Sequence, residues 1–230
     1  MLELKEGVKV SIRGPATLAG MCRFGINELG ALTWLPRLVA RVRQEHPELI
    51  LHPHVDLGRR RERQVARGEL DFAIVPGPPE DLHIASHMVG EVRLAWTAAP
   101  ARIKRRKVFT VSELSQHPVI TMTEGSGLTK AFDVWAGEQG LRMQRIVASN
   151  SLMAIVGLTL ADVGLSFLPR AFVKPWVDRG ALATCRSDPP LPSLRYCFVH
   201  RQEDRRSMIP TLLRCVMAEA RFDMPAGFAS

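Results

Sequence analysis

The chain alternates short apolar runs with longer segments in which apolar residues recur every three or four positions. Apolar runs occupy residues 71–75, 118–122 and 164–168, and a proline lies within or directly beside each of them. Residues 34–44 carry their Trp, Leu and Val residues at helical spacing. Residues 91–97 predict a further strand, and residues 152–160 predict an apolar helix with Asn150 or Ser151 as its N-cap. Gly140 is expected directly after the helix that contains residues 128–136. Buried strands that alternate with amphipathic helices are typical of a parallel sheet with helical crossovers. The sequence therefore predicts an α/β fold.

This pattern of strand, short polar loop and helix occurs twice, at residues 24–43 and again at residues 119–138. The repetition predicts two similar Rossmann-like lobes. Ligands of open α/β sheets bind at the carboxyl ends of the strands, so we expect a central ligand cleft between the lobes. The predicted organisation is an N-terminal segment (1–21), lobe I (22–87 and 192–230) and lobe II (88–191).

The composition is that of an ordinary globular protein. The 230 residues are 46% apolar and carry a formal charge of +8, which is enough chain for one large or two small cores. The first dozen residues mix charges with apolar residues and lack the apolar core of a signal peptide. We therefore expect a cytoplasmic location and no membrane association. The basic runs at residues 59–63 and 102–107 contain no aromatic residues that could stack on bases, which favours solvated surfaces over nucleic-acid contacts.

The sequence gives little support for a metal site or for reactive cysteines. The four cysteines are scattered without a C-x-x-C motif, which predicts reduced, structural thiols. His52 and His54 could face the same side of a strand, but no third ligand stands near them in the sequence. The sequence therefore predicts no metal and no cofactor.

The stretch TEGSGLTKAF, residues 123–132, leads into a helical segment and provides backbone N–H groups for an anion. Its spacing does not match a P-loop, and its two glycines lack the third that a dinucleotide fingerprint needs. Neither Ser126 nor Ser166 lies in a nucleophile elbow, G-x-S-x-G. An anion-binding position without catalytic residues predicts a binding protein and not an enzyme.

Four stretches, in this order, carry a resemblance to a known family. They are FGINELGALTWLP with the following HPEL, then GELDFAIV, then HPVITMTEGSGL, and finally SNSLMAIVGLTLADVGLSFLP. The chain resembles the effector-binding domain of LysR-type transcriptional regulators from about residue 23 to residue 220. The resemblance implies the two-lobed fold of the type 2 periplasmic solute-binding proteins.

The resemblance also implies where a small-molecule effector would bind. In that family the effector lies between the lobes, with its acidic group on loops that follow the strands. The corresponding candidate ligand-binding residues are Asn27, Glu28, Leu29, Gly30, Ala31, Pro76, Thr123, Glu124, Gly125, Ser126, Gly127, Ser149, Asn150 and Ser151.

This sequence departs from the family at several of these positions. Leu29 stands where the family often has Ser or Thr, so a hydroxyl contact is not expected there. Glu28 and Glu124 flank two of the loops and should repel a purely anionic ligand, which favours an acid that also carries an amine or a hydroxyl. Arg61 and Glu62 occupy positions that look apolar in many relatives, so we expect the basic helix to be more exposed or to serve as a contact surface.

The expected function is therefore the sensing of a small organic acid, with ligand-driven lobe closure altering promoter binding. The resemblance implies a homodimer or homotetramer, paired through the helix at residues 34–44 and the basic helix. Promoter DNA would be bound by an N-terminal winged helix-turn-helix that this chain does not contain, and residues 1–13 would be a remnant of the linker helix. The alternative is a stand-alone solute-binding protein. An enzyme on the same fold would need catalytic residues that the sequence does not show.

Overall fold

The computed structural model describes residues 17–56, 59–103 and 108–224. The predicted linker remnant and most of the second basic run, residues 104–107, therefore lie outside the described residues. The strands are β1 (Gly20–Ile26), β2 (Leu49–Val55), β3 (Phe72–Pro76), β4 (Ile84–Ala98), β5 (Val108–Thr110), β6 (Val119–Met122), β7 (Arg145–Ser149), β8 (Leu165–Pro169), β9 (Ala183–Asp188) and β10 (Ser193–Arg201). The helices are α1 (Glu28–Thr33), α2 (Leu35–Glu45), α3 (Arg59–Ala66), α4 (Pro100–Ile103), α5 (Val111–Leu114), α6 (Gly127–Glu138), α7 (Leu152–Leu160), α8 (Arg170–Asp178) and α9 (Met208–Glu219).

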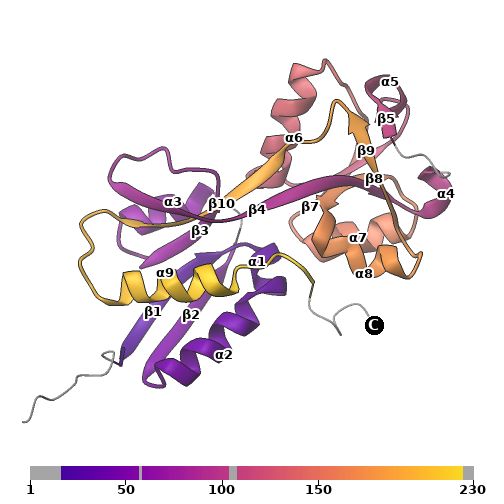
Figure 1. Cartoon of the computed structure of the whole chain (residues 1–230). Helices are drawn as coiled ribbons and strands as arrows, with labels where there is room; N and C mark the ends of the chain where they lie inside the picture. Colours follow the sequence, from indigo (N-terminus) through magenta and orange to yellow (C-terminus); the bar gives the residue numbers. More distant parts are fainter. Residues whose placement is uncertain (1–16, 57–58, 104–107, 225–230) are drawn as a thin grey trace, which may run out of the picture.

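The strands form one sheet in the order β2-β1-β3-β10-β4-β8-β6-β7, with β9 beside β4 and β5 beside β9. Strands β1, β2 and β3 run parallel to one another, as do β6, β7 and β8. Figure 1 shows these two groups as separate halves of the molecule, each with its own helices, and β4 and β10 extend between them. The predicted α/β class and the two-lobed architecture are confirmed.

Strand β4 belongs to both halves. Its residues Ile84 to Arg93 pair with β10, and Leu94 to Thr97 then pair with β8. The sequence predicted only residues 91–97 as a strand, because residues 84–90 include polar and exposed positions without an apolar run. Their extended conformation comes from pairing with β10. The lobe boundaries proposed from the sequence stay a prediction.

Local sequence signals determine several helix ends. The Ser151 side chain accepts a hydrogen bond from the Ala154 N–H at 3.3 Å and so caps α7, which occupies the range predicted for it. Gly140 has φ of +60° directly after α6, as expected for a residue that ends a helix. One prediction was wrong: the polar loop expected at residues 27–31 is instead Asn27 followed by the short helix α1, because Asn27 caps the N–H of Gly30 at 3.1 Å.

Aromatic residues dominate the core of both halves. In the half that contains β1, β2 and β3, the ring of Phe72 stacks between Phe24 and Phe198, with centroid distances of 4.7 and 4.3 Å. In the other half, Trp96 packs against Phe132 and Phe167. No helix within the described ranges is long and apolar enough to span a membrane.

The stacked column predicts a large effect of Phe72→Ala. All three rings are fully buried, and truncating a buried Phe typically costs about 3 to 5 kcal/mol of unfolding free energy. Urea denaturation should show this loss. Leu82→Ala is the control, because Leu82 is 90% exposed and its truncation should change stability by less than about 0.5 kcal/mol. Equal effects of the two substitutions would contradict the packing described.

Candidate ligand-binding cleft

The beginnings of α1, α6 and α7 converge where the two halves of the molecule meet. They enclose a cavity of about 30 Å³, which is roughly the space of a single water molecule. Its lining also includes the end of β3, one residue of β10 and one residue of α3. The lining residues are Asn27, Glu28, Leu29, Arg61, Pro76, Met122, Ser126, Gly127, Leu128, Leu152 and Tyr196.

Asn27 and Tyr196 contribute polar side chains to the lining of this cavity. While its Oδ1 caps α1, the Asn27 Nδ2 donates a hydrogen bond to the Tyr196 hydroxyl at 3.0 Å. The ring of Tyr196 stacks on Phe222 with a centroid distance of 4.9 Å. Burial raises the pKa of Tyr196 to about 12, although the hydrogen bond from Asn27 acts in the opposite direction. The hydroxyl is therefore neutral at physiological pH.

Arg61 lies inside the protein, although the basic helix that carries it was expected to be more exposed or to serve as a contact surface. The residue is 1% exposed, and its Nη1 donates to the Ile74 carbonyl at 2.7 Å while its Nη2 donates to the Asp56 carbonyl. Gly25 makes room for it, because a Cβ there would lie 2.5 Å from the Arg61 Cδ. Its Nε is buried without a hydrogen-bond partner within the described part of the chain.

The guanidinium of Arg61 keeps its positive charge in this position. Burial lowers its pKa to about 10, against the raising effects of Tyr196 and Asp56, so the group is protonated at neutral pH. A buried cation that lines a cavity and has a free N–H favours an anionic occupant.

The predicted anion-binding stretch forms a turn into α6. Gly125 has φ of +91°, which favours glycine. Ser126 stands at the N-cap, but its hydroxyl lies 3.4 Å from the Met122 sulfur and does not cap the helix. The first-turn amides of α6 are thus not capped by the Ser126 side chain.

Gly127 brings the two halves into close contact. A Cβ at this position would lie 2.3 Å from the Cγ of Pro76, which ends β3. The absence of a side chain therefore allows the beginning of α6 to rest on the Pro76 ring, and this contact helps to keep the cavity small.

Glu28 crosses from one half to the other. Its carboxylate accepts hydrogen bonds from the Ser151 hydroxyl at 3.0 Å and from the Leu152 N–H. The negative charge therefore lies at the beginning of α7, where the helix dipole and free amides stabilise it. The sequence-based expectation that Glu28 repels a bound anion is revised, because its charge is already satisfied by α7.

A larger cavity adjoins the small one on the other side of Pro76 and Gly127. It has a volume of about 590 Å³ and includes the predicted residues Glu124, Gly125 and Ser126. Apolar residues line part of it, and acidic residues and Lys130 line the remainder. The apolar members include Val75, Ala131, Val134 and Leu194, and the acidic members are Glu62, Glu80, Glu124 and Asp133.

The structure thus brings most of the predicted residues to one place. Asn27, Glu28 and Leu29 line the small cavity, Glu124 and Gly125 line the larger one, and three others line both: Pro76, Ser126 and Gly127. The remaining predicted residues line neither cavity; they are Gly30, Ala31, Thr123, Ser149, Asn150 and Ser151. Ser151 is instead bonded to Glu28, and the Thr123 N–H donates to the Ser149 carbonyl at 3.0 Å.

Sequence reasoning missed Arg61 and Tyr196. Arg61 was noticed as unusual for its position, and the physical signal was available: an arginine on the apolar side of a helix, four residues before the buried Val65. Tyr196 lies within an apolar strand, and nothing in its neighbours marks it as facing a cavity.

The cysteines and metal-binding residue types show no second chemistry in this region. All four cysteines are buried. Within the described ranges, no three His, Cys, Asp or Glu side chains lie close enough together to hold a metal ion.

Comparison with protein families identifies the chain. Residues 15–221 match the family described as the LysR substrate binding domain. The chain belongs to this family. Members of the LysR family are transcriptional regulators and not enzymes, so this LysR domain is the effector-binding part of a regulator of that type.

Known proteins with similar sequences are regulators. The LysR domain is 22% identical to the HTH-type transcriptional regulator CzcR of Bacillus subtilis, over 90% of this chain and 69% of the relative. It is 23% identical to the uncharacterised HTH-type transcriptional regulator YusT of the same species, over 94% of this chain and 70% of the relative.

Solved structures with a similar fold are regulatory domains of the same kind. The regulatory domain of Synechocystis CcmR in complex with 2-PG matches with a TM-score of 0.76 at 18% identity, over 86% of this chain and 96% of that domain. The effector-binding domain of QuiR in complex with shikimate matches with a TM-score of 0.74 at 14% identity, over 87% of this chain and 96% of that domain. These likenesses confirm the type 2 periplasmic-binding-protein-like fold.

The buried phenol gives a direct test of the cleft geometry. Tyr196 is the only tyrosine in the chain, so its absorbance near 295 nm reports one group. We expect it to ionise at about pH 12 in the folded protein and at about pH 10 in urea. The corresponding stability, about 2 to 3 kcal/mol, is present below pH 10 and is lost as the pH rises towards 12. Ionisation near pH 10 in the folded protein would show that the hydroxyl is open to solvent.

Proposed function

We propose that this LysR domain senses a small organic acid that binds between the two lobes and alters their relative position. The observation that carries the proposal is the convergence of an uncapped helix beginning, α6, with the buried and charged Arg61 at one inter-lobe cavity. Two structural neighbours were solved with the anions shikimate and sulfate, which supports an anionic ligand here.

The acidic group would be held by α6 and Arg61. The first-turn amides of α6 can donate to an oxyanion, and the Arg61 Nε is a buried donor without a partner in the described part of the chain. Hydrogen bonds to charged groups contribute about 1.5 to 3 kcal/mol each. The beginning of α7 is a weaker candidate, because the Glu28 carboxylate already occupies it.

The remainder of the ligand would extend into the cavity of about 590 Å³ beside Pro76. Val75, Val134 and Leu194 offer an apolar surface there, while Glu124 offers a carboxylate to an amine or a hydroxyl. The ligand that fits both ends is an organic acid with a short apolar body and a hydrogen-bond donor. The cavity of about 30 Å³ holds no such molecule, so its entry requires the lobes to separate.

Lobe movement would connect binding to regulation. Among the described residues, the contacts that join the lobes at the cleft include Glu28 with Ser151 and Leu152, Pro76 with Gly127, and the ion pair of Lys130 with Glu80 at 3.8 Å. A ligand that replaces or reinforces these contacts shifts the equilibrium by its differential affinity for the two lobe positions. A coupling of about 1 to 3 kcal/mol is typical of allosteric proteins.

The full regulator would act in the cytoplasm as a homodimer or homotetramer, with promoter DNA bound by an N-terminal winged helix-turn-helix. Exposed apolar residues support pairing of the lobes: Met21 and Ile50 lie opposite each other on β1 and β2, and Val134 is exposed on α6 in the other half. We call Met21 and Ile50 the first patch and Val134 the second patch. In an antiparallel pair of domains, the first patch of one copy would meet the second patch of the other. Helix α2 and helix α3 flank the first patch along the chain.

Binding at α6 is tested with a matched pair of substitutions on one helix. Gly127→Ala places a methyl group against Pro76, whereas a Cβ at Gly137 meets nothing within 4 Å. An organic-acid library screened by thermal shift, followed by calorimetry, should find a ligand for the wild type and for Gly137→Ala. Gly127→Ala should bind it at least about tenfold more weakly, which corresponds to about 1.4 kcal/mol.

Equal affinity of the two variants would exclude the beginning of α6 as the acid-binding position. A library that gives no heat with the wild type at millimolar concentration would contradict the proposed function as a whole.

Pairing is tested at β2. Ile50 is 60% exposed, and Ile50→Glu should weaken self-association at least about tenfold in sedimentation equilibrium, because a charge would be buried in the interface. The control is Leu82→Glu, at a residue that is 90% exposed outside both patches. A wild type that stays monomeric at high concentration, or equal effects of both variants, would contradict the proposed interface.

A further inference from the structure

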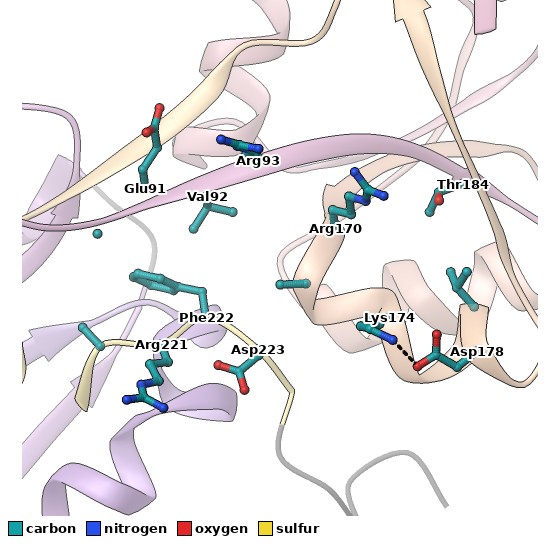
Figure 2. Close-up of a pocket in the computed structure, with 14 residues that line it drawn as sticks. Glu91, Val92, Arg93, Arg170, Lys174, Asp178, Thr184, Arg221, Phe222 and Asp223 are labelled. Carbon is teal, nitrogen blue, oxygen red and sulfur yellow. Dashed lines mark hydrogen bonds and ion pairs between the residues drawn. The ribbon is translucent and has the colours of Figure 1, made fainter. Parts of the chain in front are cut away.

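A second cavity lies along β4, away from the inter-lobe cleft. It has a volume of about 780 Å³, and three arginines line it: Arg93 of β4, Arg170 of α8 and Arg186 of β9. None of these residues lines the small inter-lobe cavity or the cavity that adjoins it. Arg93 and Arg170 also line a neighbouring cavity of about 680 Å³, which Figure 2 shows.

Strand pairing brings the three arginines together. Leu94 pairs with Pro169, so Arg93, the residue before Leu94 on β4, lies close to Arg170, which follows Pro169 as the first residue of α8. Trp96 pairs with Cys185, and Arg186 follows Cys185 on the other side of β4. In Figure 2 the Arg170 side chain extends from the beginning of α8 towards β4, the strand that carries Arg93.

None of these arginines is paired with a carboxylate of the described residues. All three are exposed, and in the part of the chain that the structure describes none makes an ion pair or a side-chain hydrogen bond. Nearby Lys174 differs, because its Nζ lies 2.5 Å from the Asp178 carboxylate. Like charges on neighbouring strands repel one another, and an anion between them would remove that repulsion.

A hydroxyl adds a hydrogen-bond donor to the same lining. Thr184 lies two residues before Arg186 on β9, so the two side chains point to the same face of the strand. Ser187, the residue after Arg186, points to the opposite face and is buried. The Thr184 hydroxyl is therefore the one that can reach a ligand held by the arginines.

We propose that this cavity is a second ligand site, which binds a small polyanion such as a phosphorylated or multiply carboxylated metabolite. Guanidinium groups form paired hydrogen bonds with phosphate and carboxylate oxygens. Arg93, Arg170 and Arg186 would take separate oxygens, and the Thr184 hydroxyl would donate to a further one.

The phosphates of DNA offer the same chemistry, but one observation favours a small molecule. The three arginines come from three different elements that line one cavity, whereas a duplex presents its phosphates along two strands.

The experiment measures pyrophosphate binding by calorimetry on the whole chain in low salt. Arg170→Ala and Arg186→Ala should each weaken binding about tenfold, as expected for the loss of a charge-assisted hydrogen bond. Arg179→Ala is the matched control, because Arg179 is exposed just after α8 and lines neither cavity. It should bind as the wild type does.

A second variant separates binding from folding. Thr184→Val removes the hydroxyl but keeps the branched shape of this half-buried side chain, so the melting temperature should change little while pyrophosphate binds several-fold more weakly. Equal affinity of Arg170→Ala, Arg186→Ala and Arg179→Ala would overturn the proposal, and so would a wild type without measurable binding. A 20-base-pair duplex whose binding depends on Arg170 and Arg186, with pyrophosphate unaffected, would assign the cavity to nucleic acid and also overturn it.

Discussion

Strand β4 gives its hydrogen bonds to β10 in its first part and to β8 and β9 in its last part. Because both groups of strands hydrogen-bond to this one strand, β4 determines which edges of the two halves face each other. The helix beginnings of both halves are thereby brought to the same gap, where α1, α6 and α7 meet. The cleft is therefore a consequence of one shared strand, and the cross-lobe contacts of Glu28 and Gly127 adjust it.

The distribution of charge in the cleft follows from the dipoles of these helices. Helix α7 already has a carboxylate at its beginning, from Glu28, whereas α6 has none among the described side chains. Arg61 adds a positive charge behind the same cavity, and its burial makes that charge costly unless an anion or dipoles compensate it. Backbone carbonyls of Ile74 and Asp56 compensate it in part. The arrangement resembles a site in which one anionic position is filled by the protein and another is open.

The sequence predicted the parts of the fold that depend on local pattern. Helix α7 was predicted within its observed bounds, because Ser151 caps it and an uninterrupted apolar segment follows. Residues 84–90 of β4 were not predicted, since their strand conformation depends on pairing with a segment more than a hundred residues away. Helix α1 was missed because one side-chain cap, from Asn27, converts a polar stretch into helix.

The candidate site could be predicted only where the local sequence has a recognisable pattern. Residues 123–127 stand out as a glycine and hydroxyl stretch before a helix, and they do lie at the cleft. Arg61 and Tyr196 reach the same cavity from α3 and β10 by tertiary packing alone. No spacing rule connects two residues that far apart in the chain. The role of Glu28 was likewise hidden, because its partners Ser151 and Leu152 belong to the other lobe.

The four buried cysteines have a practical consequence. Burial raises the pKa of Cys22, Cys197 and Cys215, so few of these thiols are deprotonated near neutral pH, and the thiolate is the form that reacts with alkylating dyes. A new cysteine placed on the surface of each lobe would therefore take a fluorescent label in preference to the native ones. Energy transfer between two such labels could follow the separation of the lobes in solution without first removing any native residue.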